Sequence, residues 1–177
     1  MKVSAIVLAA AGLILLPVAA ISAEKVNDAQ IASIVVTANQ VDIDAGRLAV
    51  ATATSEEVKT FARLMVTDHT GVNKAATDLA AKLKVTPEDN PTSMSLKKGG
   101  MENVANLKML KGAAFDKAYI DHEVAYHEQV LEAMDKTLIP GAKNDELKAL
   151  LVSVRPAFAA HLAHAKHLQM TMMSSMH

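Results

Sequence analysis

The sequence of 177 residues contains no cysteine and no tryptophan, and aromatic residues make up only 3% of it. Without cysteine the chain cannot form a disulfide, a thiolate metal site, a cysteine nucleophile or a lipid-modified N-terminal cysteine. The scarcity of aromatic residues disfavours an all-β fold and an aromatic surface that stacks on single-stranded nucleic acid. The formal net charge of −1 offers no excess of cations for a phosphate backbone. We therefore expect no nucleic-acid partner.

The sequence is instead rich in two metal-donor residue types, with seven histidines and ten methionines. Imidazole nitrogen and thioether sulfur both bind transition metals. At roughly 100–200 residues per domain, the length indicates a single domain. The positions of these donors within that domain therefore decide whether they can act together.

The N-terminus has the pattern of a secretory signal peptide. Lys2 precedes an apolar run from Val3 to Leu16, and Pro17 and a stretch of small residues lead to Ala23. A basic start, an apolar centre and an alanine at the exit are typical of a cleaved leader. We expect residues 1–23 to be the signal peptide and residues 24–177 the mature domain, periplasmic or secreted, with no membrane contact after cleavage. A retained anchor is the alternative, because the apolar run nearly reaches the ~20 residues that span a bilayer.

After the leader, apolar residues recur with the 3.6-residue period of an α-helix. The pattern predicts four long helices and a short one: Asn27–Ala51, Thr54 to about Leu83, Leu96–Leu110 (the short one), Gly112 to about Leu138, and Asn144 to about Leu168. We interpret Pro87–Ser95 as a linker and Pro140-Gly141 as a turn. Thr54 and Glu57 match a capping box, Asn144 can cap the last helix, and Pro156 should kink that helix without ending it.

The lengths of the connections predict the fold class. Two connections are short turns, whereas the middle one is long and contains the short helix. This pattern predicts an all-α, ferritin-like four-helix bundle of two antiparallel hairpins joined by a crossover. The third long helix has a second apolar face with Phe115, Tyr119, His122 and Tyr126. We expect the crossover helix to cover that face through Val104, Leu107 and Leu110, and a homodimer contact is the alternative.

Three histidines fall on inward-facing apolar stripes, namely His69, His127 and His161. Each lies near the middle of its helix, so the three imidazoles should lie within roughly 5–8 Å of a common plane. Asp42 lies at a similar depth in the first helix. Three imidazoles and a carboxylate suit Zn, Fe or Cu, with Glu123 and Asp68 as second-layer groups that orient the rings.

Two other interpretations of these histidines remain open. They can be core residues of a structural or interaction bundle, in a metal-free network of histidine, aspartate and tyrosine hydrogen bonds. They can also belong to a metal-dependent redox enzyme, but no Glu-x-x-His motif of a di-iron carboxylate centre occurs. No Gly-x-Ser-x-Gly turn of a serine hydrolase occurs either. We therefore favour a binding or stress protein over an enzyme.

The C-terminal segment Gln169–His177 contains four methionines and follows His164 and His167. Such donors would suit Cu(I) outside the cytoplasm. The simpler interpretation, which we prefer, is a frayed helix end with loosely packed methionines.

Several segments recur in the order and spacing of a known family: Val41–Ala49, Glu57–His69, Phe115–Ile120 running to His127, and Arg155-Pro156 followed by His161-Leu162. From about Asp28 to Leu168 the chain resembles the bacterial, exported, ferritin-like domain of unknown function 4142. The resemblance implies a helical bundle and export, but no reaction. The three inward histidines match family positions, and Asp42 stands where the family tends to have the longer Glu.

Overall fold

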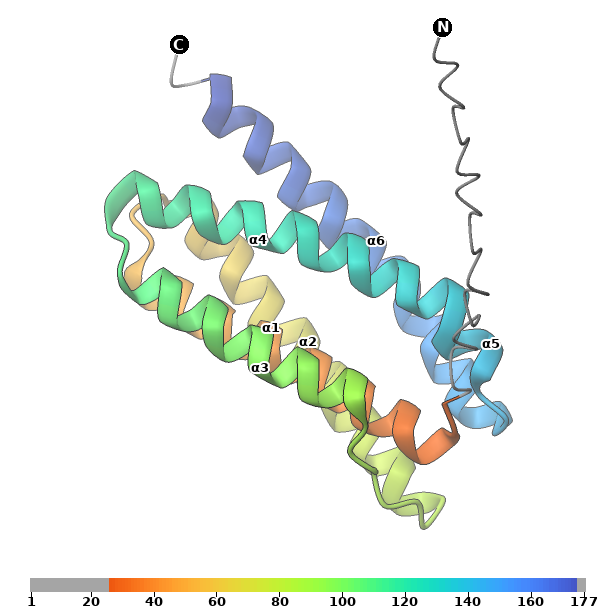
Figure 1. The fold of residues 1–177 in the computed structure, drawn as a ribbon. Helices are drawn as coiled ribbons and strands as arrows, with labels where there is room; N and C mark the ends of the chain where they lie inside the picture. Colours follow the sequence, from red (N-terminus) through yellow and green to blue (C-terminus); the bar gives the residue numbers. More distant parts are fainter. Residues whose placement is uncertain (1–25, 175–177) are drawn as a thin grey trace, which may run out of the picture.

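The computed structural model describes residues 26–174, which form a bundle of helices without a strand (Figure 1). The long helices are α1 (Asp28–Thr52), α2 (Glu56–Lys82), α4 (Gly112–Ala133) and α6 (Asp145–Ser174), and α3 (Pro91–Lys108) lies in the connection between α2 and α4. The expected all-α class is confirmed. No helix within residues 26–174 is long and apolar enough to cross a membrane. The expected signal peptide, residues 1–23, lies outside the described residues.

Contacts at the helix ends show how the chain runs. α1 packs against α2, and α4 packs against α6. α3 begins beside the start of α1, where the Glu88 amide donates to the Ala29 carbonyl, and then follows α1 (Figure 1). α4 begins beside the end of α1, where the Asp116 carboxylate accepts a hydrogen bond from the Thr54 amide. The crossover helix thus returns the chain along α1 before the second hairpin starts.

Two helix starts differ from the sequence-based expectation. α3 begins at Pro91, so part of the expected linker is helical, because the Asn90 side chain accepts hydrogen bonds from the Thr92 and Ser93 amides and proline suits the first helical position. The cap of α2 is Ser55 and not Thr54. The Thr54 amide, which a capping box would pair with Glu57, donates to Asp116 instead, and so does the Thr54 hydroxyl.

The second hairpin contains a feature that the periodicity did not predict. A π-helical segment, η1 (Met134–Leu138), continues α4 and leads into the three-residue α5 (Ile139–Gly141). Asn144 then caps α6 as expected, and α6 continues through Pro156. The extra residue of a π-turn re-aims the side chains that follow it, and such turns are frequent at functional sites.

The interior has two apolar clusters with a buried polar layer between them. On α2, Met65 belongs to one cluster and Val72 borders the other, and His69 lies between them. His127 and His161 hold the same intermediate position on α4 and α6. The second face of α4 is covered as expected at its start, where Phe115 and Tyr119 pack with Leu107, Val104 and Leu110 of the α3 region.

Gly100 is required for the close packing of α3 on α1. A Cβ at Gly100 would lie 2.6 Å from Val41 Cγ2, whereas a Cβ at Gly99 would meet nothing within 4 Å. We expect Gly100→Ala to lower the free energy of unfolding by about 1–3 kcal/mol through overpacking. The matched variant Gly99→Ala should raise it by up to about 1 kcal/mol, because alanine favours the helix. Urea unfolding of both variants checks this; equal effects would contradict the close approach.

Candidate metal centre

The bundle brings the three inward histidines together in its buried polar layer. The ring centroids of His69, His127 and His161 are 5.3–5.5 Å apart in all three pairs. Their side chains are almost inaccessible to solvent, with 0–3% of each residue exposed. One ring nitrogen from each histidine lies within 4.8 Å of the other two. The sequence prediction that these three residues share one level is confirmed.

Asp42 of α1 reaches the same centre. Its Oδ2 lies 3.2 Å from His69 Nε2 and 3.7 Å from His127 Nε2. Ligands bound tetrahedrally at 2.0–2.1 Å from one ion are about 3.4 Å apart. The carboxylate is therefore already at a suitable distance from two of the imidazoles. The aspartate side chain is therefore long enough to reach the centre from α1.

Each histidine uses its other ring nitrogen to contact an outer group. His161 Nε2 lies 2.9 Å from Asp68 Oδ2, and His127 Nδ1 lies 3.0 Å from the Glu123 carbonyl oxygen and 3.4 Å from its Oε2. The two residues predicted to orient the rings thus contact His127, in the case of Glu123, and His161, in the case of Asp68. The third partner, Asn39, was not predicted, and its Oδ1 lies 2.8 Å from His69 Nδ1. The Asn39 amide in turn donates to the Val35 carbonyl, which fixes its orientation.

The atoms that face the centre have no hydrogen-bond partner within the protein. They are His69 Nε2, His127 Nε2, His161 Nδ1 and both carboxylate oxygens of Asp42. A buried polar atom without a partner costs about 1–3 kcal/mol, so several in one place require a common explanation. A divalent cation would satisfy all four residues at once. The His nitrogens would have to approach one another by at most about 1.4 Å to bind one ion at zinc–nitrogen distances. These residues therefore fit a metal ion.

Burial keeps the ionisable groups of the centre uncharged. Burial lowers the pKa of His69 to about 2, and the neighbouring His127 and His161 contribute to this shift. Burial also lowers the pKa of His127, to about 4. Burial also raises the pKa of Asp42 to about 8, and it raises the pKa of Glu123 with a further contribution from Asp42. Neutral imidazole is the form that binds metals, so the histidines are in the required state at neutral pH.

A second set of donors overlaps the first. Asp42, Glu123 and His127 also bring one donor atom each within 4.8 Å of one another. The Glu123 carboxyl also interacts with the buried hydroxyl of Tyr119. Glu123 is therefore close enough to serve as a ligand as well as an outer group for His127.

Two neighbours of His69 were missed in the sequence. Phe158 stacks on the His69 ring at a centroid distance of 4.9 Å and an interplanar angle of 18°. Phe158 lies three residues before His161 and Asn39 three residues before Asp42, so each shares a helix face with an expected ligand. A polar residue on the apolar stripe of α1 was the signal that could have identified Asn39.

The other histidines lie outside this centre. His122 stacks on Tyr126, His164 packs edge-on against Phe61, and His167 is exposed. The methionine-rich end is helical as far as Ser174 and not frayed there, with Met170 and Met173 exposed and Met172 packed against the core. Met176 and His177 lie outside the described residues.

Comparison with known proteins connects the fold to one family. No curated protein and no solved structure matches the chain. A family model does match, and it covers residues 16–168, which include the whole metal centre. The resemblance seen in the sequence is thereby confirmed, and the chain belongs to the family described as the domain of unknown function DUF4142.

Proposed function

We propose that this protein binds one divalent transition-metal ion through His69, His127, His161 and Asp42. The observation that carries the proposal is the convergence of four buried donor residues whose inward atoms have no partner in the protein. Zn, Fe and Cu all accept such a set of nitrogen and oxygen ligands. In a metal-free network a protonated Asp42 carboxyl can donate to only one of the three inward ring nitrogens, so two stay unpaired, which disfavours the structural alternative.

The donor set favours holding a metal over catalysis. Structural zinc sites use four protein ligands, whereas catalytic sites keep one position open for water or substrate. Three histidines and an aspartate supply all four positions. A metal-dependent redox activity therefore has weaker support than a metal-binding role, in a stress response for example.

We further propose that the domain is exported and ferritin-like. The leader pattern in residues 1–23 supports a periplasmic or secreted location. Two antiparallel helix pairs with a helical crossover are consistent with the ferritin plan. A homo-oligomer is compatible with this plan.

Zinc titration of tag-free protein tests the metal site and the outer contact of His161 together. We expect one equivalent to bind the wild type. Asp68→Ala should weaken affinity by about 10–100-fold, because Asp68 orients the His161 ring and makes it a stronger ligand. Asp78→Ala is the matched control, since Asp78 lies on the same helix and only pairs with Lys74 at the surface.

Competition with a chromophoric chelator gives the dissociation constants. A wild type that binds no Zn, Fe or Cu would overturn the proposed function. Equal affinities for the Asp68→Ala and Asp78→Ala variants would show that Asp68 does not support the site.

A further inference from the structure

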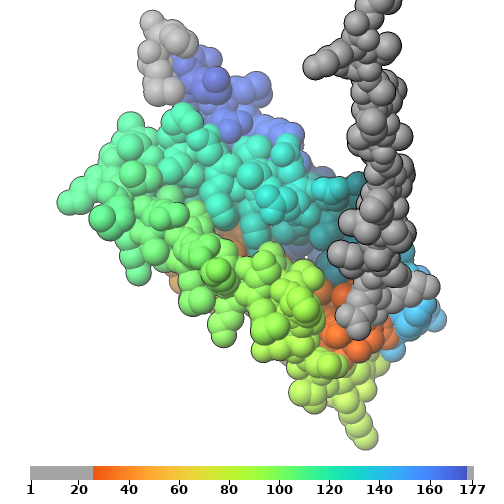
Figure 2. All heavy atoms as spheres, viewed as in Figure 1, coloured from red at the N-terminus to blue at the C-terminus, as the bar shows by residue number. Residues whose placement is uncertain are grey.

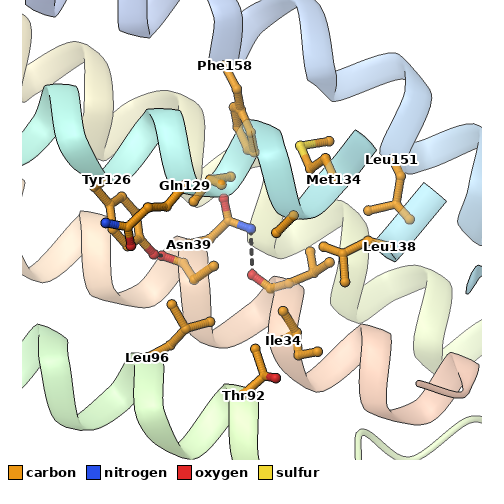
Figure 3. A pocket seen from close by; sticks show the side chains of 14 residues that line it. Ile34, Asn39, Thr92, Leu96, Tyr126, Gln129, Met134, Leu138, Leu151 and Phe158 are labelled. Atoms are coloured by element: carbon orange, nitrogen blue, oxygen red, sulfur yellow. Dashed lines mark hydrogen bonds between the residues drawn. The ribbon is translucent and has the colours of Figure 1, made fainter. Parts of the chain in front are cut away.

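A cavity of about 200 Å³ lies beside the metal centre, between α1, α3, α4, η1 and α6 (Figure 3). Its inner wall is apolar and is formed by Ile34, Met134, Leu138, Leu151 and Phe158. No charged side chain of the described residues lines it. An apolar cavity of about 150 Å³ is known to stay dry and to bind benzene. The space here is therefore large enough for an aromatic ring with a small substituent.

The cavity opens toward a groove between α3 and α4. Four residues line both the cavity and this groove: Thr92, Leu96, Tyr126 and Gln129. Figure 2 shows this face, with α3 and α4 on either side. Thr92 and Gln129 are exposed, so an uncharged hydroxyl and an uncharged amide stand at the mouth. A ligand can thus enter with its apolar part first and keep one polar group at the rim.

At its inner end the cavity reaches the groups that hold His69. Asn39 and Phe158 line the cavity, and both side chains also contact His69. Asn39 Oδ1 lies 2.8 Å from His69 Nδ1, and the Phe158 ring stacks on the His69 ring at a centroid distance of 4.9 Å. In Figure 3 the Phe158 ring points toward the Asn39 side chain. None of the four proposed metal ligands lines the cavity. A bound molecule would therefore touch the supports of the metal centre without replacing a ligand.

The π-helical segment supplies an independent reason to assign a role to this space. Met134 and Leu138, the first and last residues of η1, both line the cavity. A π-turn in place of a regular α-turn changes the direction of these side chains, and such turns are frequent at functional sites.

We propose that this cavity binds a small uncharged molecule, an aromatic ring or a short alkyl chain with one polar group, and that its binding changes the metal affinity of the centre. An ionic ligand is disfavoured, because its charge would lose hydration without gaining a partner. Ligand binding rests on the cavity alone, and the coupling rests on the proposed function. Because binding energies are linked, metal must change ligand affinity by the same factor.

The first experiment uses the metal-free full chain and follows side-chain methyl signals by NMR. Toluene and benzyl alcohol should give saturable shifts at Met134, Leu138 and Leu151. Benzoate should bind at least about tenfold more weakly because of its charge. The absence of saturable shifts with toluene and benzyl alcohol would overturn the cavity proposal, and equal binding of benzoate would overturn the assignment to uncharged molecules.

Two filling variants show where the ligand binds. Ala133→Leu and Ala38→Leu each place a larger side chain at the lining, so each should weaken toluene binding about tenfold or more. Ala125→Leu, on the exposed face of α4 and outside the lining, should leave it unchanged. Unchanged affinity in both filling variants would place the toluene elsewhere and overturn the proposal.

The second experiment measures zinc affinity with and without saturating toluene. We expect a change of about fivefold or more, within the usual range of coupling between sites. An unchanged zinc affinity would overturn the coupling alone. Failure of zinc to bind at all would overturn the proposed function, and the toluene result on metal-free protein would still stand.

Discussion

Zinc is expected to raise the melting temperature of the wild-type protein by about 5–15 °C. A ligand that binds only the folded state stabilises it by about 2.7 kcal/mol at 100 times its dissociation constant and by about 4.1 kcal/mol at 1,000 times. For a domain of this size each kcal/mol raises the melting temperature by about 2–4 °C. Because the donors come from α1, α2, α4 and α6, an ion would join all four long helices.

His161→Ala should lose this increase, since it removes one of the four ligands. His167→Ala is the matched control on the same helix, because His167 is exposed and lies outside the centre. Thermal melts with excess zinc and with EDTA compare the variants. If the histidines form only a metal-free network, zinc will shift neither the wild type nor either variant, and His161→Ala will be destabilised equally in both conditions.

Asp116→Ala should lower the free energy of unfolding by about 3 kcal/mol, the largest effect expected from a residue outside the metal centre. Asp116 is 2% exposed and stands near the start of α4. Its carboxylate accepts hydrogen bonds from the Thr54 amide at 2.9 Å, the Thr54 hydroxyl at 2.6 Å and the Ser55 amide at 2.8 Å. These bonds hold the turn between α1 and α2 against the second hairpin. Their loss removes the protein partner of the amides of Thr54, which is exposed, and Ser55, which is half-buried.

Urea unfolding measures this effect, provided that the dependence on urea is the same for each variant. Glu132→Ala on the same helix is the control; Glu132 pairs only with Lys136 at the surface, so a loss of about 0.5 kcal/mol or less is expected. Asp116→Asn should fall between the wild type and Asp116→Ala, because the amide keeps one acceptor oxygen. A loss for Asp116→Ala as small as that for Glu132→Ala would contradict the role of this contact.

The part of the metal centre that the sequence predicted follows mainly from the helical period of its apolar residues. His69, His127 and His161 each lie on an apolar stripe, and a helix has a fixed rise, so both their face and their depth follow from the sequence. Asp42 was placed by the same argument. Glu123, which lies one turn before His127, and Asp68 both contact rings of the centre, on His127 and His161, and their role as outer groups of a metal stays a prediction.

The residues that were missed depend on contacts between helices. Asn39 of α1 and Phe158 of α6 both contact the His69 ring on α2, so both contacts join residues far apart in the sequence. The error at the start of α2 has the same origin. Thr54 and Glu57 matched a capping box, but Asp116, 62 residues further along the chain, takes the Thr54 amide and hydroxyl.

The sequence by itself determined the all-α class, the family and the inward faces of three histidines, because local periodicity and short motifs encode them. Only the tertiary structure decided which ring nitrogen of each histidine faces the centre, how Gly100 sets the approach of α3 to α1, and where the apolar cavity lies. The physical reason is that helix formation follows from neighbours in the sequence, whereas hydrogen-bond pairing and cavities depend on how side chains distant in sequence fill a shared interior.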